Sequence, residues 1–246
     1  MKINLNPDLN FEAKIIVALD VSSAREAINL CDRLPQVSFW KVGLELFIAD
    51  GNTILQELKA RNKKIFLDLK LHDIPNTVAS ACRVATKYGA DFLTIHASGG
   101  RAMMQAAQAE VAGSSTQLLA VSLLTSISAA ELASDLKVSL ELTEYVSQMV
   151  LLAQQSGLTG AVCSPHEVAM LRSLLKSNQD TNNPDNFCFV TPGVRPAGVA
   201  ISDQSRVMTP KQAIAAGADY LVIGRPITQA IDPVAAWEQI CQDCVY

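Results

Sequence analysis

Residues 64–73 read KIFLDLKLHD, an apolar run interrupted by Asp68 and Lys70. The residues of this run favour a β-strand, and the stretch that follows it has the pattern of a helix. The same order, a short apolar run and then a helical stretch, occurs eight times along the chain. The eight predicted strands are KIIVALD (14–20), FWKVGL (39–44), KIFLDLKL (64–71), FLTIHA (92–97), LLAVSLL (118–124), GAVCS (160–164), FCFVT (187–191) and YLVIG (220–224).

The spacing of these runs indicates how the strands are joined. Six of the seven intervals between successive starts are 25 to 33 residues long, which suits a strand, a helix and two short loops. The runs are apolar at consecutive positions, as in a parallel sheet covered on both faces. We therefore predict an α/β fold with a single domain over residues 1–246, a (β/α)8 TIM barrel. A doubly wound open sheet is the alternative, but eight regular units favour closure. Residues 126–138 lengthen the fifth unit and predict a small extra helix.

Composition excludes several classes of protein. The 246 residues are 49% hydrophobic with a formal charge of −4, which argues against disorder and against a general polyanion binder. The longest apolar runs have five residues, too short for a membrane span, and the N-terminal residues MKINLNPDLNFEAK do not resemble a secretory signal. Four of the six cysteines lie in apolar or helical stretches. We therefore expect reduced thiols and a cytoplasmic protein.

The two charges of the third predicted strand are the strongest functional signal. Strand side chains alternate, so Asp68 and Lys70 are expected to share one side while Leu67, Leu69 and Leu71 face the other. Burying a charge costs folding free energy, so two charges on one face of an apolar strand point to a function beyond folding. Lys41, at the end of the second strand, can extend this pair into a Lys–Asp–Lys–Asp chain. A lysine held between carboxylates stays protonated, which suits a proton donor rather than a Schiff-base nucleophile. The structural alternative is an ion pair that only holds the barrel mouth together.

A second predicted site lies at the ends of the seventh and eighth strands. Barrels commonly bind phosphate there, and Gly224 allows an anion to approach backbone N–H groups at the start of a helix. Arg195 and Arg225 can add charge-assisted hydrogen bonds. Residues 196–209 have the polar, glycine-containing composition of a lid, with Gln204 and Arg195 as candidate ligand contacts. An ordinary surface loop is the alternative for this segment.

These motifs resemble those of the orotidine 5′-phosphate decarboxylase family over nearly the whole chain. The DxKxxD spacing of residues 68–73 is shared with a wider superfamily of sugar-phosphate decarboxylases and aldolases. The continuation IPNT (74–77) narrows the resemblance, as do the blocks TPGVR (191–195) and VIGRP (222–226). Further matching segments are ALD (18–20), KVG (41–43), TIHASGG (94–100) and LTS (124–126). No motif position departs from the family pattern.

The resemblance implies a role for each matching residue. Lys70 protonates C6 of the pyrimidine as carbon dioxide leaves, and Asp68 sits beside the substrate carboxylate. Lys41 and Asp20 hold the ribose hydroxyls. The resemblance also implies catalytic roles for Asp73 and Lys41.

The resemblance further implies a homodimer and a pocket for the rest of the substrate. Asp73 and Thr77 reach into the site of the partner subunit. The remaining substrate-binding residues are Thr125 in the pocket and, around the 5′-phosphate and the lid, Arg195, Gln204, Gly224 and Arg225. The implied reaction converts orotidine 5′-monophosphate to uridine 5′-monophosphate with no metal or organic cofactor.

Two other functions fit the same fold. A metal-dependent sugar-phosphate lyase needs further acidic ligands at strand ends, and Glu45 is the unassigned acid that could serve. A nucleotide-binding barrel without catalysis is the other alternative. It gains nothing from the three charges of Asp68, Lys70 and Asp73.

Overall fold

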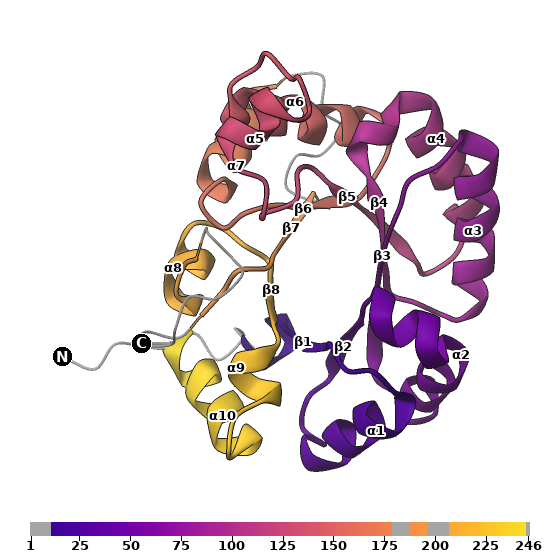
Figure 1. The fold of residues 1–246 in the computed structure, drawn as a ribbon, viewed down its shortest axis with the longest axis vertical. Coiled ribbons are helices and arrows are strands. Elements are labelled where there is room, and N and C mark those ends of the chain that lie inside the picture. The colour runs from indigo at the N-terminus through magenta and orange to yellow at the C-terminus, as the bar shows by residue number, and fades with distance from the viewer. Residues whose placement is uncertain (1–10, 179–186, 196–206, 245–246) are drawn as a thin grey trace.

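The computed structural model describes residues 11–178, 187–195 and 207–244. Eight parallel strands close into a barrel in sequence order, each paired with its neighbours in the chain and the last with the first (Figure 1). This confirms the predicted TIM barrel and all eight predicted strands. The strands are β1 (Ile15–Leu19), β2 (Phe39–Val42), β3 (Lys64–Leu71), β4 (Phe92–His96), β5 (Gln117–Val121), β6 (Gly160–Val162), β7 (Cys188–Thr191) and β8 (Tyr220–Ile223).

Helices surround the barrel, as Figure 1 shows. The α-helices are α1 (Ala24–Arg33), α2 (Leu44–Ala60), α3 (Pro75–Lys87), α4 (Gly100–Val111), α5 (Ala129–Ser134), α6 (Leu142–Gln155), α7 (Val168–Ser177), α8 (Pro210–Ala215), α9 (Arg225–Thr228) and α10 (Pro233–Asp243). Two short 3-10 helices, η1 (Phe11–Lys14) and η2 (Ala97–Gly99), precede β1 and α4. The extra helix predicted within residues 126–138 is α5, and a capping box between Ser128 and Glu131 starts it.

The apolar residues form two separate cores. The larger one lies between the sheet and the helices, and the smaller one fills the barrel interior with Ile16, Phe39, Phe66, Phe92, Leu119 and Val190. Aromatic rings dominate the interior, where Phe92 lies 5.2 Å from Phe39 and 5.1 Å from Tyr220 between ring centroids. The barrel is therefore a packed core rather than a channel.

Strand β3 is irregular where it carries its charges. Its Leu67 pairs with Leu93 and its Leu71 with Ile95, so four steps along β3 match two along β4. The extra residues form a bulge, and Lys70 within it has a left-handed backbone with φ of 49°. Because the surplus is two residues, the alternation of side chains survives, and Leu67, Leu69 and Leu71 all pack against the outer core as predicted.

Candidate active site

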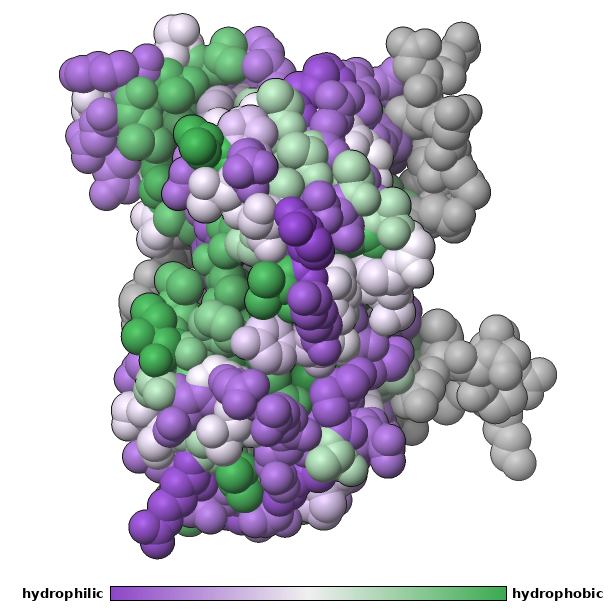
Figure 2. Space-filling view, turned by 90° about the vertical axis from the view of Figure 1, so that its right-hand side faces the viewer, coloured by the Kyte–Doolittle hydropathy of each residue, from purple (hydrophilic) through white to green (hydrophobic). Residues whose placement is uncertain are grey.

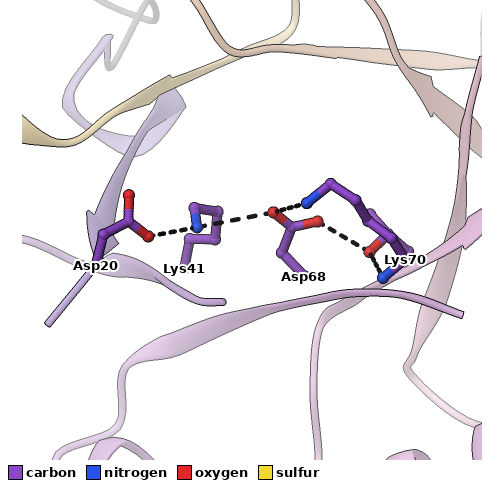
Figure 3. Close-up of polar contacts among 5 residues, drawn as sticks. Asp20, Lys41, Asp68 and Lys70 are labelled. Atoms are coloured by element: carbon purple, nitrogen blue, oxygen red, sulfur yellow. Dashed lines mark hydrogen bonds and ion pairs between the residues drawn. The ribbon is translucent and has the colours of Figure 1, made fainter. Parts of the chain in front are cut away.

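Four charged side chains form one row across the C-terminal mouth of the barrel (Figure 3). Lys41 Nζ lies 2.8 Å from Asp20 Oδ1 and 3.7 Å from Asp68 Oδ2, and Lys70 Nζ lies 2.7 Å from the same Asp68 oxygen. Asp20 follows β1, Lys41 is on β2, and the other two are on β3. The row confirms that Lys41 extends the pair of Asp68 and Lys70. Its second carboxylate is Asp20, at the Lys41 end, so Lys41 rather than Lys70 lies between two carboxylates.

Burial increases toward the centre of this row. The side chains of Lys41 and Asp68 are 11% exposed, that of Lys70 is 30% exposed and that of Asp20 is 56% exposed. Burial by itself raises the pKa of Asp68, but the charges of Lys41 and Lys70 and the hydrogen bonds from Lys70 and Thr94 lower it below its ordinary value. Asp68 is therefore a carboxylate at neutral pH, although it is nearly enclosed.

Thr94 joins the row from β4; it begins the matching segment TIHASGG, but the sequence analysis gave it no role. Its hydroxyl donates to Asp68 Oδ1 over 3.0 Å and accepts the backbone N–H of Lys70 over 2.9 Å. Thr94 is fully buried and is the hydroxyl residue in the apolar run FLTIH. A buried hydroxyl between Leu93 and Ile95 in a barrel strand is the signal that could have identified it.

Gly43 leaves the space that the Lys41 ammonium occupies. A Cβ atom at this position would lie 3.0 Å from Lys41 Nζ and 3.5 Å from Asp20 Oδ1. The distance to Lys41 Nζ is shorter than most contacts that Cβ atoms make in proteins. The glycine is also the N-cap of α2, directly after β2. The motif KVG therefore combines a charged residue with the small residue that makes room for its head group.

The predicted phosphate-binding residues face the same cavity as the charged row. This cavity has a volume of about 440 Å³, within the usual range for small-ligand sites. Asp20, Lys41, Asp68 and Lys70 line it together with four predicted binding residues, Thr125, Arg195, Gly224 and Arg225. The sequence analysis gave no role to the other lining residues, which are Ala18, Phe66, Val162, Pro192, Val222 and Gln229.

Local backbone structure orients the residues for which phosphate binding is predicted. Gly224 caps α9, and Arg225 and Pro226 begin it. A Cβ atom on Gly224 would lie 3.4 Å from the Ala18 Cβ atom and 3.5 Å from Asp20 Oδ2, so the glycine allows the end of β8 to approach the end of β1. On the other side, Val194 bridges to Met208, and this bridge flanks Arg195, which is 7% exposed.

Two predicted site residues, Asp73 and Thr77, do not line the cavity of the described chain. Asp73 and Thr77 are exposed beyond β3, and the Asp73 carboxylate accepts the backbone N–H of Ile74 over 2.6 Å. Gln204 lies outside the described residues, as does most of the predicted lid. Glu45, the acid considered for a metal-dependent lyase, is exposed on the first turn of α2 and is not a lining residue.

The described residues contain neither a metal-binding cluster nor a membrane-spanning helix. Within residues 11–178, 187–195 and 207–244, no three His, Cys, Asp or Glu side chains lie close enough together to bind a metal ion. In the same part of the chain, none of the helices has the length and hydropathy needed to cross a bilayer.

The fold and the site together define a (β/α)8 barrel in which a Lys–Asp row and two arginines line one small cavity. Residues 13–240 match the model of the orotidine 5′-phosphate decarboxylase / HUMPS family, and the chain belongs to that family.

The chain is also similar to individual proteins named orotidine 5′-phosphate decarboxylase. The chain is 60% identical over 232 residues to an orotidine 5′-phosphate decarboxylase of Gloeothece citriformis, covering 94% of this chain and 97% of that one. It is 55% identical over 237 residues to one of a Nostoc species, covering 94% and 96% of the two chains. The crystal structure of orotidine 5′-phosphate decarboxylase from Lactobacillus acidophilus superposes with a TM-score of 0.81 at 38% identity, covering 95% of this chain and all of the other.

Proposed function

We propose that this protein decarboxylates orotidine 5′-monophosphate to uridine 5′-monophosphate and carbon dioxide in pyrimidine biosynthesis. The observation that carries the proposal is the buried Asp68 carboxylate, with Lys70 Nζ 2.7 Å away, in a cavity that Arg195 and Arg225 also line. Membership of the family and the names of close relatives support the same reaction.

The chemistry explains why an ammonium is needed beside the carboxylate. Loss of carbon dioxide leaves a carbanion at C6 that the pyrimidine ring delocalises poorly. A fixed positive charge at that carbon stabilises the transition state more than the ground state, and the same group can then donate a proton. We assign the donor role to Lys70, with Asp68 beside the departing carboxylate, because this lysine contacts a buried carboxylate and faces the cavity.

The rest of the substrate is assigned to the ends of the cavity. Asp20 and Lys41 hold the ribose hydroxyls, because their paired charges border the same space. Arg195, Gly224 and Arg225 bind the 5′-phosphate, and Thr125 lines the same pocket. The free energy of phosphate binding can then lower the activation barrier at C6, because contacts with non-reacting parts of a substrate also stabilise the transition state.

The reaction is proposed to need no metal or organic cofactor. The direct test is the loss of orotidine 5′-monophosphate absorbance with the purified protein, with and without EDTA. We expect turnover at the same rate in both. Loss of activity with EDTA would favour a metal-dependent sugar-phosphate lyase, and nucleotide binding without turnover would favour a barrel that only binds.

We also propose that two copies of the chain share their active sites. Asp73 and Thr77 are exposed beside the cavity rather than in it, as expected of residues that serve a partner. Large hydrophobic side chains are exposed nearby at Leu44, Ile48 and Ile74, which are 51%, 80% and 66% exposed. Figure 2 looks onto the side where α2 and α3 lie and shows hydrophobic residues gathered among hydrophilic ones. An apolar patch of this kind suits a two-fold interface.

Subunit mixing tests this arrangement. Lys70→Ala and Asp73→Ala chains are each expected to be nearly inactive. In a mixed dimer one site carries both changes and the other carries neither. Random mixing at equal amounts makes about half of the dimers mixed, so about one quarter of wild-type activity should return. If subunits exchange and activity does not return, Asp73 serves its own chain.

Two broader expectations follow the same proposal. The whole chain, residues 1–246, forms one catalytic domain, which the extent of the family match over residues 13–240 supports. The protein works in the cytoplasm, which is supported by six cysteines that are all thiols rather than disulfides.

A further inference from the structure

We propose that Thr94 is a positioning residue for the decarboxylation, because its hydroxyl holds both the Asp68 carboxylate and the backbone of Lys70. The inference rests on the proposed function for its kinetic consequence. Thr94 does not line the cavity, so it acts through the two residues that it contacts.

The register of the sheet explains why this side chain is needed. Between the pairs Leu67–Leu93 and Leu71–Ile95, β3 has three residues and β4 has Thr94 alone. A regular backbone ladder cannot match three residues with one. The Thr94 hydroxyl accepts the Lys70 N–H over 2.9 Å, so a side chain takes the place of a ladder carbonyl inside the bulge.

The hydrogen-bond directions follow from the chemistry of the groups. The carboxylate of Asp68 only accepts and the amide of Lys70 only donates. The single hydroxyl proton of Thr94 is therefore directed to Asp68 Oδ1, and a lone pair is left for the amide. Threonine satisfies both requirements with one oxygen, and valine, its closest apolar match in shape, satisfies neither.

The result is a carboxylate held at both oxygens. Thr94 occupies Oδ1, and Lys70 Nζ contacts Oδ2 at 2.7 Å with Lys41 Nζ at 3.7 Å. Rotation of the carboxylate would break one of these contacts. The same hydroxyl supports the left-handed backbone of Lys70, a conformation that residues other than glycine rarely adopt and that persists only where the surroundings impose it.

A second buried threonine, Thr116, provides a control that separates a positioning role from a general effect on stability. Thr116 is 5% exposed, and its hydroxyl donates to the Ala90 carbonyl over 2.7 Å just before β5, at the opposite end of the barrel from the charged row. Thr116→Val removes a buried hydroxyl of the same kind without affecting Asp68. We expect it to change stability but neither turnover nor its dependence on pH.

The kinetic test compares Thr94→Val with Thr94→Ser, which keeps the hydroxyl. We expect kcat of Thr94→Val to fall about 10- to 100-fold, the range for one hydrogen bond to a charged group, with KM changed by less than about threefold. Thr94→Ser should return kcat to within about threefold of wild type. If Thr94→Val does not fold, Thr94→Ala removes the same hydroxyl and replaces it in every assay.

A second measurement does not need the reaction. NMR titration of the Asp68 carboxyl carbon should give a higher pKa in Thr94→Val than in wild type, because a hydrogen bond to the charged form is lost. The ionisable groups that surround this carboxylate are Lys41, Lys70, His96 and, through Lys41, Asp20. All of them are present in both proteins.

The outcomes separate the inference from the proposed function. If wild-type protein leaves orotidine 5′-monophosphate unchanged, the proposed function fails, and the Asp68 titration still tests the contact. If wild type is active and Thr94→Val keeps both its kcat and its Asp68 pKa, Thr94 has no positioning role. The same conclusion follows if Thr94→Ser is as impaired as Thr94→Val, or if Thr116→Val shows the same loss of kcat.

Discussion

Replacement of Lys70 by alanine and by glycine separates its chemical role from its backbone conformation. Both changes remove the ammonium that lies 2.7 Å from Asp68. They differ at the backbone, because Lys70 has φ of 49°, where alanine is strained and glycine is not. The pair therefore measures activity and strain independently at one position.

The expected activity loss is large and common to both variants. Loss of a positioned proton donor costs about 10²–10⁴ in rate, and loss of a preorganised charge about 10²–10³. Their product is about 10⁴–10⁷, which corresponds to about 5–10 kcal/mol of transition-state stabilisation. Both variants should still fold, because Lys41 continues to face the buried Asp68.

The expected stability difference is small and favours glycine. A left-handed conformation costs a residue with a Cβ atom about 1–2 kcal/mol, and the greater freedom of glycine in the unfolded chain offsets about 0.5–1 kcal/mol of this. Lys70→Gly should therefore be about 0.5–1 kcal/mol more stable than Lys70→Ala in urea unfolding. Lys137 is the matched control, since it has φ of 56° and is exposed beyond α5, so its glycine and alanine variants should differ similarly without loss of activity.

The measurements are absorbance loss of orotidine 5′-monophosphate and urea denaturation of each variant. A Lys70→Ala enzyme within tenfold of wild type would refute the assignment of Lys70 as proton donor. Equal stability of the glycine and alanine variants at position 70, with the expected difference at position 137, would show that the bulge does not strain Lys70.

Three further predictions use the same protein. Arg225→Ala should lower kcat/KM for orotidine 5′-monophosphate by about 10-fold or more while barely changing turnover of orotidine without phosphate, and equal losses would show a role in the fold alone. Burial raises the pKa of the Cys31 thiol from 9.0 to about 11, which leaves about 100-fold less thiolate at pH 8, so this thiol should react slowly with a disulfide reagent until the protein unfolds. Because the pKa of Asp68 is below its ordinary 3.8 in the folded protein, its ionisation stabilises the fold above that pH and this contribution is lost as the pH falls through the lowered value. Acid unfolding of Asp68→Asn should accordingly depend less on pH than that of wild type.

Much of the site follows from one-dimensional patterns. The alternation along β3 predicts that Asp68 and Lys70 meet, and the 2.7 Å contact confirms it. The assumption of a regular strand was wrong, because β3 contains a bulge. The prediction still holds because two surplus residues restore the period of two.

The sequence by itself determined the barrel and the residues that carry the charge. Eight apolar runs separated by helical stretches leave few ways to bury both faces of a parallel sheet, and the ends of parallel strands gather at one edge. The tertiary structure alone decided the register between β3 and β4. This register depends on backbone hydrogen bonds between segments that are distant in the chain. The side-chain pattern of one strand does not predict those hydrogen bonds. The hydroxyl of Thr94 and the space beside Gly43 belong to this second category, since each matters only through the atoms that the closed barrel brings against it.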